Sequence, residues 1–127
     1  MSNHDPGVTL RQIADYARQA QAICEGKTLP ALMGDWQALL AFERALEILG
    51  EAVKRLPAEL RARYPAVPWR LVAGMRDRLS HGYDDIRHDV LWNTVQRDVP
   101  VLLRTVEQML RDLQSGPGGT PGNEPSS

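Results

Sequence analysis

The fold is decided by residues 35–56, which read DWQALLAFERALEILGEAVKRL. Apolar side chains recur there at alternating steps of three and four residues, at Leu39, Phe42, Leu46, Leu49, Val53 and Leu56. This spacing predicts a helix with one continuous apolar seam, which favours packing against other helices at a shallow angle. Asp35 is a suitable N-cap, and Pro57 ends the helix. Trp36 and Leu40 widen the apolar face, as in a helix that packs against more than one neighbour.

Helical spacing continues on both sides of this segment, without any strand or hairpin pattern. We expect a first helix over residues 9–24, with Thr9 as its N-cap, followed by a break at Gly26 and Pro30. A short helical turn is expected near residues 58–63. A third main helix is expected over residues 68–82, because proline suits a first helical position and glycine suits an end.

The last helix is expected over residues 89–113, with Asp89 as its N-cap. Its apolar residues again alternate at steps of four and three: Trp92, Val95, Val99, Leu102, Val106, Met109 and Leu113. Pro100 lies inside this pattern, so we expect a kink rather than an end. Four principal helices with short connections and helical turns predict an all-α fold, an antiparallel bundle. The two unbroken seams favour a homodimer, because a small bundle often buries surplus apolar surface against its own copy.

The length of 127 residues suits one domain. The C-terminal stretch is rich in glycine, proline and serine and cannot bury enough surface to become ordered. We therefore expect a flexible N-terminus over residues 1–8, a helical bundle domain over residues 9–113 and a disordered tail over residues 114–127.

The formal net charge of -1 excludes a global basic field, so nucleic-acid binding would need a local patch. The single cysteine, Cys24, is expected to be buried, which agrees with a reducing compartment. No apolar run is long enough to span a membrane, and residues 1–6 do not resemble a signal peptide. We expect a cytoplasmic protein. Neither His4 nor His88 has partners at metal-ligand spacing, so no metal or other cofactor is expected.

Residues 76–83 read RDRLSHGY and combine a guanidinium, a carboxylate, an imidazole and a phenol. Arg76 can bind phosphate, and His81 can move protons near neutral pH. Such a pair can cut RNA without a metal, because the attacking 2′-hydroxyl belongs to the substrate. His81 would act as general base or acid, and Arg76 would hold the non-bridging phosphate oxygens. DNA lacks this hydroxyl and would be spared.

Spacing constrains how these side chains meet. Asp77 and His81 are four residues apart and share a helix face, so Asp77 can orient the imidazole. Arg76 and His81 lie about 140° apart around an ideal helix. Arg76 must therefore reach His81 by its own length, through a bend at Gly82, or across a homodimer whose two copies line one cleft. The alternative is a surface network of capping contacts and ion pairs without catalysis.

Residues 76–83 resemble the R-x4-H-x-Y motif of HepT-like toxins in the HEPN superfamily. The likeness extends over about residues 9–113. Further segments resemble the family's signatures in the same order: residues 46–52 (LEILGEA), 64–70 (YPAVPWR), 89–92 (DVLW) and 98–100 (DVP).

The resemblance implies a dimerising helical bundle that is a metal-independent endoribonuclease. It would act on RNA as the toxin of a type II/VII-like toxin–antitoxin pair. Its implied partner is a minimal nucleotidyltransferase antitoxin, which transfers adenylyl groups from ATP to the motif tyrosine, here Tyr83. Arg76 and His81 would be catalytic, and Asp77 would be the supporting polar residue. The family commonly has asparagine where this chain has Asp77.

Two other hypotheses stay open. The bundle could be a non-catalytic binding module that recruits a nucleotidyltransferase or a nucleotide through Arg76 and His81, or it could be the antitoxin of its pair. Glu43 and Glu47 are expected to form plain ion pairs, although Glu47 and Glu51 could position Arg76. The three tryptophans are predicted to be core or dimer aromatics: Trp36, Trp69 and Trp92.

Overall fold

The computed structural model describes residues 5–80 and 86–115, and all regular structure in these ranges is helical. The helices are α1 (Pro6–Cys24), α2 (Leu29–Met33), α3 (Trp36–Lys54), α4 (Ala58–Ala62), α5 (Trp69–Ser80), α6 (His88–Arg97) and α7 (Val99–Ser115). The predicted all-α class is confirmed. None of these helices combines the length and the hydropathy that crossing a membrane requires.

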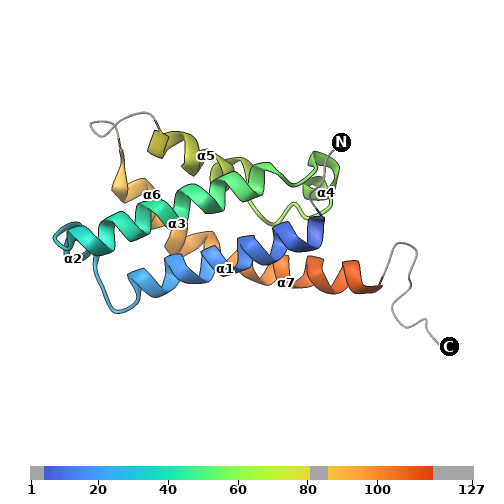
Figure 1. Ribbon diagram of the computed structural model, residues 1–127, viewed down its shortest axis with the longest axis horizontal. Helices are drawn as coiled ribbons and strands as arrows, with labels where there is room; N and C mark the ends of the chain where they lie inside the picture. The colour runs from blue at the N-terminus through green and yellow to red at the C-terminus, as the bar shows by residue number, and fades with distance from the viewer. Residues whose placement is uncertain (1–4, 81–85, 116–127) are drawn as a thin grey trace.

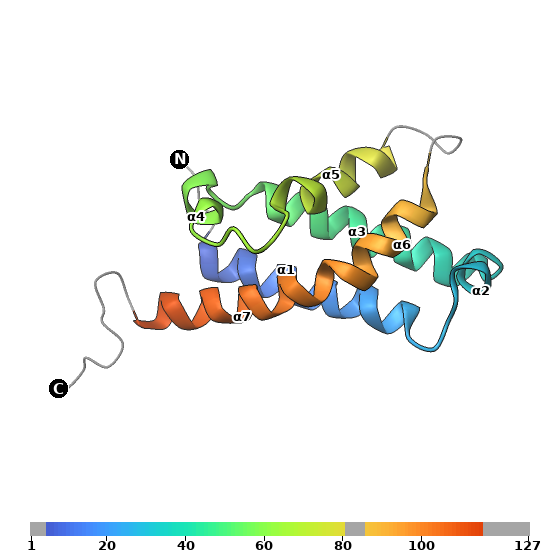
Figure 2. The same cartoon turned by 180° about the vertical axis from the view of Figure 1, so that it is seen from behind.

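The bundle is built around α3, which packs against α1 on one side and α5 on the other. Figure 1 shows α3 antiparallel to both, with the short helices α2 and α4 at its two ends. From behind, α7 lies along α1, and α6 leads into it from the side of α5 (Figure 2). The short connections thus bring the long helices side by side, as the sequence predicts.

The apolar seam of α3 forms the centre of the core, because its side chains are almost completely shielded from solvent: Phe42, Leu46, Leu49, Val53 and Leu56. The predicted stripes of the flanking helices meet it and are buried as well: Leu10, Ile13, Ala17, Ala20, Val99, Leu102 and Val106. Each large apolar side chain buried in this way contributes about 1.5–3 kcal/mol. The predicted periodicity is therefore confirmed in the core but not at the ends of the two seams, since Leu39 is only partly buried and Leu113 is 42% exposed.

Two predicted N-caps are wrong. α1 begins at Pro6, and Asp5 caps it by accepting a hydrogen bond of 2.9 Å from a first-turn amide. Thr9 is buried inside that helix, which starts earlier because proline suits its first position. At α6, Arg87 occupies the N-cap position without a side-chain cap, while Asp89 lies in the first turn and pairs with Arg87 at 2.8 Å.

The segment before α3 holds one confirmed and one unexpected feature. Asp35 caps α3 as predicted, by accepting a hydrogen bond of 3.1 Å from the amide of Ala38. The unexpected feature is α2, which Thr28 caps by accepting 3.2 Å from the amide of Ala31. Pro30 does not prevent this short helix, because a missing N–H is tolerated in the first turn.

Pro100 bends the last predicted helix and divides it at Asp98 into α6 and α7. Its ring lacks an N–H and, in an unbroken helix, would clash with the carbonyl of Gln96, four residues earlier. Helical hydrogen bonds continue on both sides of the bend, because the Asp98 amide donates to Thr94 O at 2.8 Å and the Asp98 carbonyl accepts from Leu102 N at 2.9 Å. The chain turns without leaving the helical path, as predicted.

The tryptophans divide between core and surface. Trp69 is buried, and Trp92 packs partly buried against the core. Trp36 is 67% exposed and Leu40 is 54% exposed, so Trp36 is not a core residue, and the other predicted position, in a dimer contact, stays a prediction. Trp36 and Leu40 lie four residues apart, on a side of α3 that faces away from its neighbours.

Gly50 allows the backbones of α3 and α5 to touch. A Cβ at this position would lie 2.9 Å from Arg76 N, 3.0 Å from Arg76 Cβ and 3.1 Å from the carbonyl oxygen of Ala73. These atoms belong to the backbone or are attached directly to it, so they cannot swing aside. The missing side chain of Gly50 thus sets the distance between the helices at the point where Arg76 leaves α5.

We expect Gly50→Ala to destabilise the protein by about 1–3 kcal/mol through overpacking, partly offset by the better helix propensity of alanine, about 1 kcal/mol. The matched control is Gly74→Ala on α5, where an added Cβ meets nothing within 4 Å. That variant should be as stable as the parent or up to about 1 kcal/mol more stable. Urea unfolding followed by circular dichroism measures both. Equal stabilisation by the two substitutions would show that Gly50 is not a contact point.

Candidate functional site

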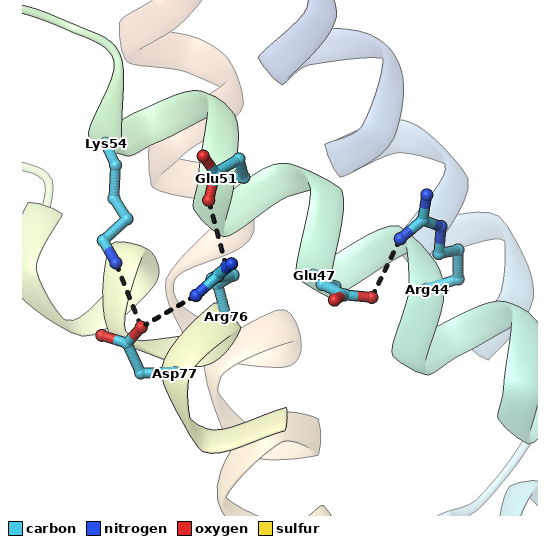
Figure 3. Close-up of polar contacts among 6 residues, drawn as sticks. All are labelled: Arg44, Glu47, Glu51, Lys54, Arg76 and Asp77. Carbon is cyan, nitrogen blue, oxygen red and sulfur yellow. Dashed lines mark hydrogen bonds and ion pairs between the residues drawn. The ribbon is translucent and has the colours of Figure 1, made fainter. Parts of the chain in front are cut away.

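Arg76 is held at the junction of α3 and α5 by a carboxylate from the neighbouring helix (Figure 3). Its Nε lies 3.1 Å from Glu51 Oε1, and one terminal nitrogen lies 3.7 Å from Asp77 Oδ1. The Arg76 side chain is 40% exposed, so a ligand in solution can reach it. A guanidinium with a fixed direction and an open approach is suited to binding phosphate.

Asp77 links the same two helices. Its Oδ1 accepts a hydrogen bond of 3.0 Å from Lys54 Nζ on α3 and also faces Arg76 (Figure 3). The Lys54 side chain is 40% exposed and the Asp77 side chain is 49% exposed. Ion pairs exposed to this extent contribute about 0–1 kcal/mol. The network of Glu51, Lys54, Arg76 and Asp77 therefore orients side chains more than it stabilises the fold.

Two of the predicted site residues, His81 and Tyr83, lie outside the described residues, as does the predicted contact between Asp77 and His81. The structure describes α5 up to Ser80, the residue before His81. Of the four predicted side chains, it brings Arg76 and Asp77 together.

Nearby carboxylates pair with basic side chains. Glu47 binds Arg44 at 3.0 Å, which confirms the expected ion pair (Figure 3). Glu43 instead contacts His88, with 2.6 Å between Oε2 and Nε2, and both side chains are mostly buried. Sequence reasoning missed the partners His88 and Lys54, because each pair joins two helices far apart in the chain.

A groove of about 370 Å³ lies beside Arg76, where α1, α3 and α5 meet. Most of its lining is polar or charged: Gln12, Tyr16, Arg44, Glu47, Ile48, Glu51, Arg55 and Arg76. With three arginines and two glutamates, the groove carries one net positive charge on a chain whose formal charge is -1. It is therefore a local basic patch of the kind that nucleic-acid binding by this chain would need.

Cys24 takes no part in this chemistry. Burial raises the pKa of its thiol to about 11, although nearby Lys27 acts in the opposite direction. The thiol is therefore protonated at neutral pH and is neither a nucleophile nor a good metal ligand. Within residues 5–80 and 86–115, histidine, cysteine and acidic side chains form no group of three that could hold a metal ion.

Comparison with protein families gives one match of wide extent. Residues 13–109 match the family model described as Ribonuclease HepT-like. This range includes all four predicted site residues and most of the bundle.

Individual relatives agree with the family match. The chain is 36% identical over 114 residues to "Putative RNase MJ0127" of Methanocaldococcus jannaschii, covering 90% of this chain and 94% of the relative. It is 43% identical over 75 residues to "Probable ribonuclease HepT" of Thermococcus cleftensis, covering 59% of this chain and 68% of the relative. It is 45% identical over 71 residues to "Putative RNase TTE0752" of Caldanaerobacter subterraneus, covering 56% of this chain and 63% of the relative. No solved structure matches the chain.

Proposed function

The chain belongs to the HepT-like ribonuclease family, and we propose that it is a metal-independent endoribonuclease. The observation that carries the proposal is the placement of Arg76, which Glu51 orients at 3.1 Å beside a basic groove. The relatives, whose names describe ribonucleases, support RNA as the substrate.

The chemistry assigns one role to each motif residue. Arg76 binds the non-bridging oxygens of the cleaved phosphate and stabilises the charge that develops on them. His81 removes the proton from the 2′-hydroxyl or protonates the leaving oxygen, since its ordinary pKa near 6.5 suits both steps. Asp77 is the supporting polar residue. No metal is required, because the nucleophile is part of the RNA.

We further propose that this cytoplasmic nuclease is the toxin of a type II/VII-like toxin–antitoxin pair. Its partner is a nucleotidyltransferase antitoxin that adenylylates Tyr83. The motif places Tyr83 two residues after His81. An adenylyl group adds negative charge and bulk there, and it would repel the phosphates of RNA.

The active unit that we propose is a homodimer in which Arg76 and His81 of both copies line one cleft. Support comes from α3, whose outer side exposes Trp36 and Leu40 to solvent. A second copy that covered these side chains would remove apolar surface from water.

We expect Arg76→Ala and His81→Ala each to lower kcat for RNA cleavage by about 10²-fold or more, because each removes a group that acts on the reacting phosphate. Purified protein, RNA and a chelator suffice for the measurement. The control Arg111→Ala removes an exposed arginine on α7 and should cleave like the parent. Full activity of both variants would refute the site. Tight RNA binding by a parent that never cleaves would instead favour the non-catalytic module.

Glu51 is a positioning residue in this proposal, because it touches Arg76 and not the substrate. We expect Glu51→Ala to lower kcat by about tenfold, while Glu51→Gln, which keeps an acceptor oxygen, retains more activity. The matched control is Glu47→Ala, which removes the partner of Arg44 one turn earlier on α3. Equal losses in Glu51→Ala and Glu47→Ala would mean that general electrostatics, and not the orientation of Arg76, sets the rate.

Tyr83→Phe removes the hydroxyl that would accept the adenylyl group. We expect this variant to inhibit growth when expressed with the proposed nucleotidyltransferase antitoxin, whereas the parent should be neutralised and show a gain in mass of one or more adenylyl groups. Neutralisation of Tyr83→Phe to the same extent as the parent would rule out Tyr83 as the acceptor.

A further inference from the structure

We propose that the groove beside Arg76 binds a second phosphate of single-stranded RNA, next to the cleaved one, and that Arg55 is the side chain that binds it. This inference rests on the proposed function, because it assigns another contact to the same substrate. It differs from the catalytic motif in helix and in role, since Arg55 binds substrate and takes no part in the bond cleavage.

Arg55 is a partly buried cation without a counter-charge. It caps the C-terminus of α3 and donates a hydrogen bond to the side-chain oxygen of Gln12 on α1, which is neutral. Its Nε is buried without a hydrogen-bond partner, and no carboxylate of the described residues forms an ion pair with it. Because a charge removed from water is costly when unpaired, this position favours an anionic ligand.

The two glutamates of the groove do not cancel the charge of Arg55. Glu47 is paired with Arg44 at 3.0 Å, and Glu51 is paired with Arg76 at 3.1 Å. The single net positive charge of the groove therefore resides at Arg55. An RNA phosphate is attracted to this end, while the two paired carboxylates are already neutralised by their own arginines.

The spacing suits neighbouring phosphates of one strand. Arg55 follows Glu51 by one helical turn, about 6 Å along α3, and Glu51 is the residue that holds Arg76. A strand whose reacting phosphate lies on Arg76 would thus bring an adjacent phosphate to Arg55. The lining of the groove also includes the ring of Tyr16 and the apolar side chain of Ile48, against which an unpaired base can pack.

The test is binding of a 2′-O-methyl RNA oligonucleotide, which cannot be cleaved, measured by fluorescence anisotropy in chelator at several salt concentrations. We expect Arg55→Gln to weaken binding about tenfold or more, as for the loss of one charge-assisted contact. The slope of log K against log salt should fall by about 0.7, the value for one phosphate contact of a single strand. Arg111→Gln on α7 is the charge-matched control and should keep the affinity and slope of the parent.

A second variant, Gln12→Glu, tests the proposal independently of whether Arg55→Gln folds correctly. Gln12→Glu leaves Arg55 in place but gives it the missing counter-charge, so it should weaken binding and lower the slope to the same extent. Parental affinity and slope in Gln12→Glu, or in folded Arg55→Gln, would overturn the proposal, as would a parent that does not bind the oligonucleotide. A parent that binds through Arg55 but leaves unmodified RNA intact would support the groove and refute the nuclease.

Discussion

The backbone contact between α3 and α5 at Gly50 is the constraint on which the site depends. Any side chain there would meet Arg76 N at 2.9 Å, so only glycine lets the helices approach this closely. The approach brings Glu51 and Lys54, the next residues on that side of α3, to Arg76 and Asp77 on α5. Half-exposed ion pairs are too weak to hold two helices together. The site is thus positioned by apolar packing and one missing Cβ, and the charges then orient within that frame.

The distribution of charge explains how a chain with a formal net charge of -1 can offer a site for an anion. Each glutamate of the groove lies beside one arginine, whereas among the described side chains Arg55 has only the neutral partner Gln12. Binding energy for phosphate is therefore local and does not require a basic surface over the whole molecule. In the proposed site, Arg76, held through Nε, would orient the phosphate, and Arg55 would attract it.

Local patterns in the sequence predicted the seams of the long helices, although two of the three predicted N-caps, Thr9 and Asp89, were wrong. The seams of α3 and α7 and the Asp35 cap follow from periodicity and capping, which need only neighbouring residues. Contacts between helices could not be predicted, because they depend on register and direction: His88 reaches Glu43 across 45 positions and Lys54 reaches Asp77 across 23. The exposure of Trp36 could not be predicted for the same reason, because apolar spacing along one helix does not show which of its apolar side chains a neighbouring helix will cover. Arg76 and Asp77, which are neighbours in the sequence, lie 3.7 Å apart, while the roles of all four motif residues stay predictions.

The central claim is that the substrate supplies its own nucleophile at a phosphate held by Arg76. The most direct measurement uses a DNA oligonucleotide with one internal ribonucleotide, incubated with the purified protein in chelator and analysed by mass spectrometry. Cleavage only on the 3′ side of that ribonucleotide, with a 2′,3′-cyclic phosphate on the product, is the expected result. Cleavage at deoxyribonucleotides would show that the 2′-hydroxyl is not the nucleophile. Cleavage of this strand and of all-RNA strands only after a divalent metal is added would show that the reaction depends on a metal.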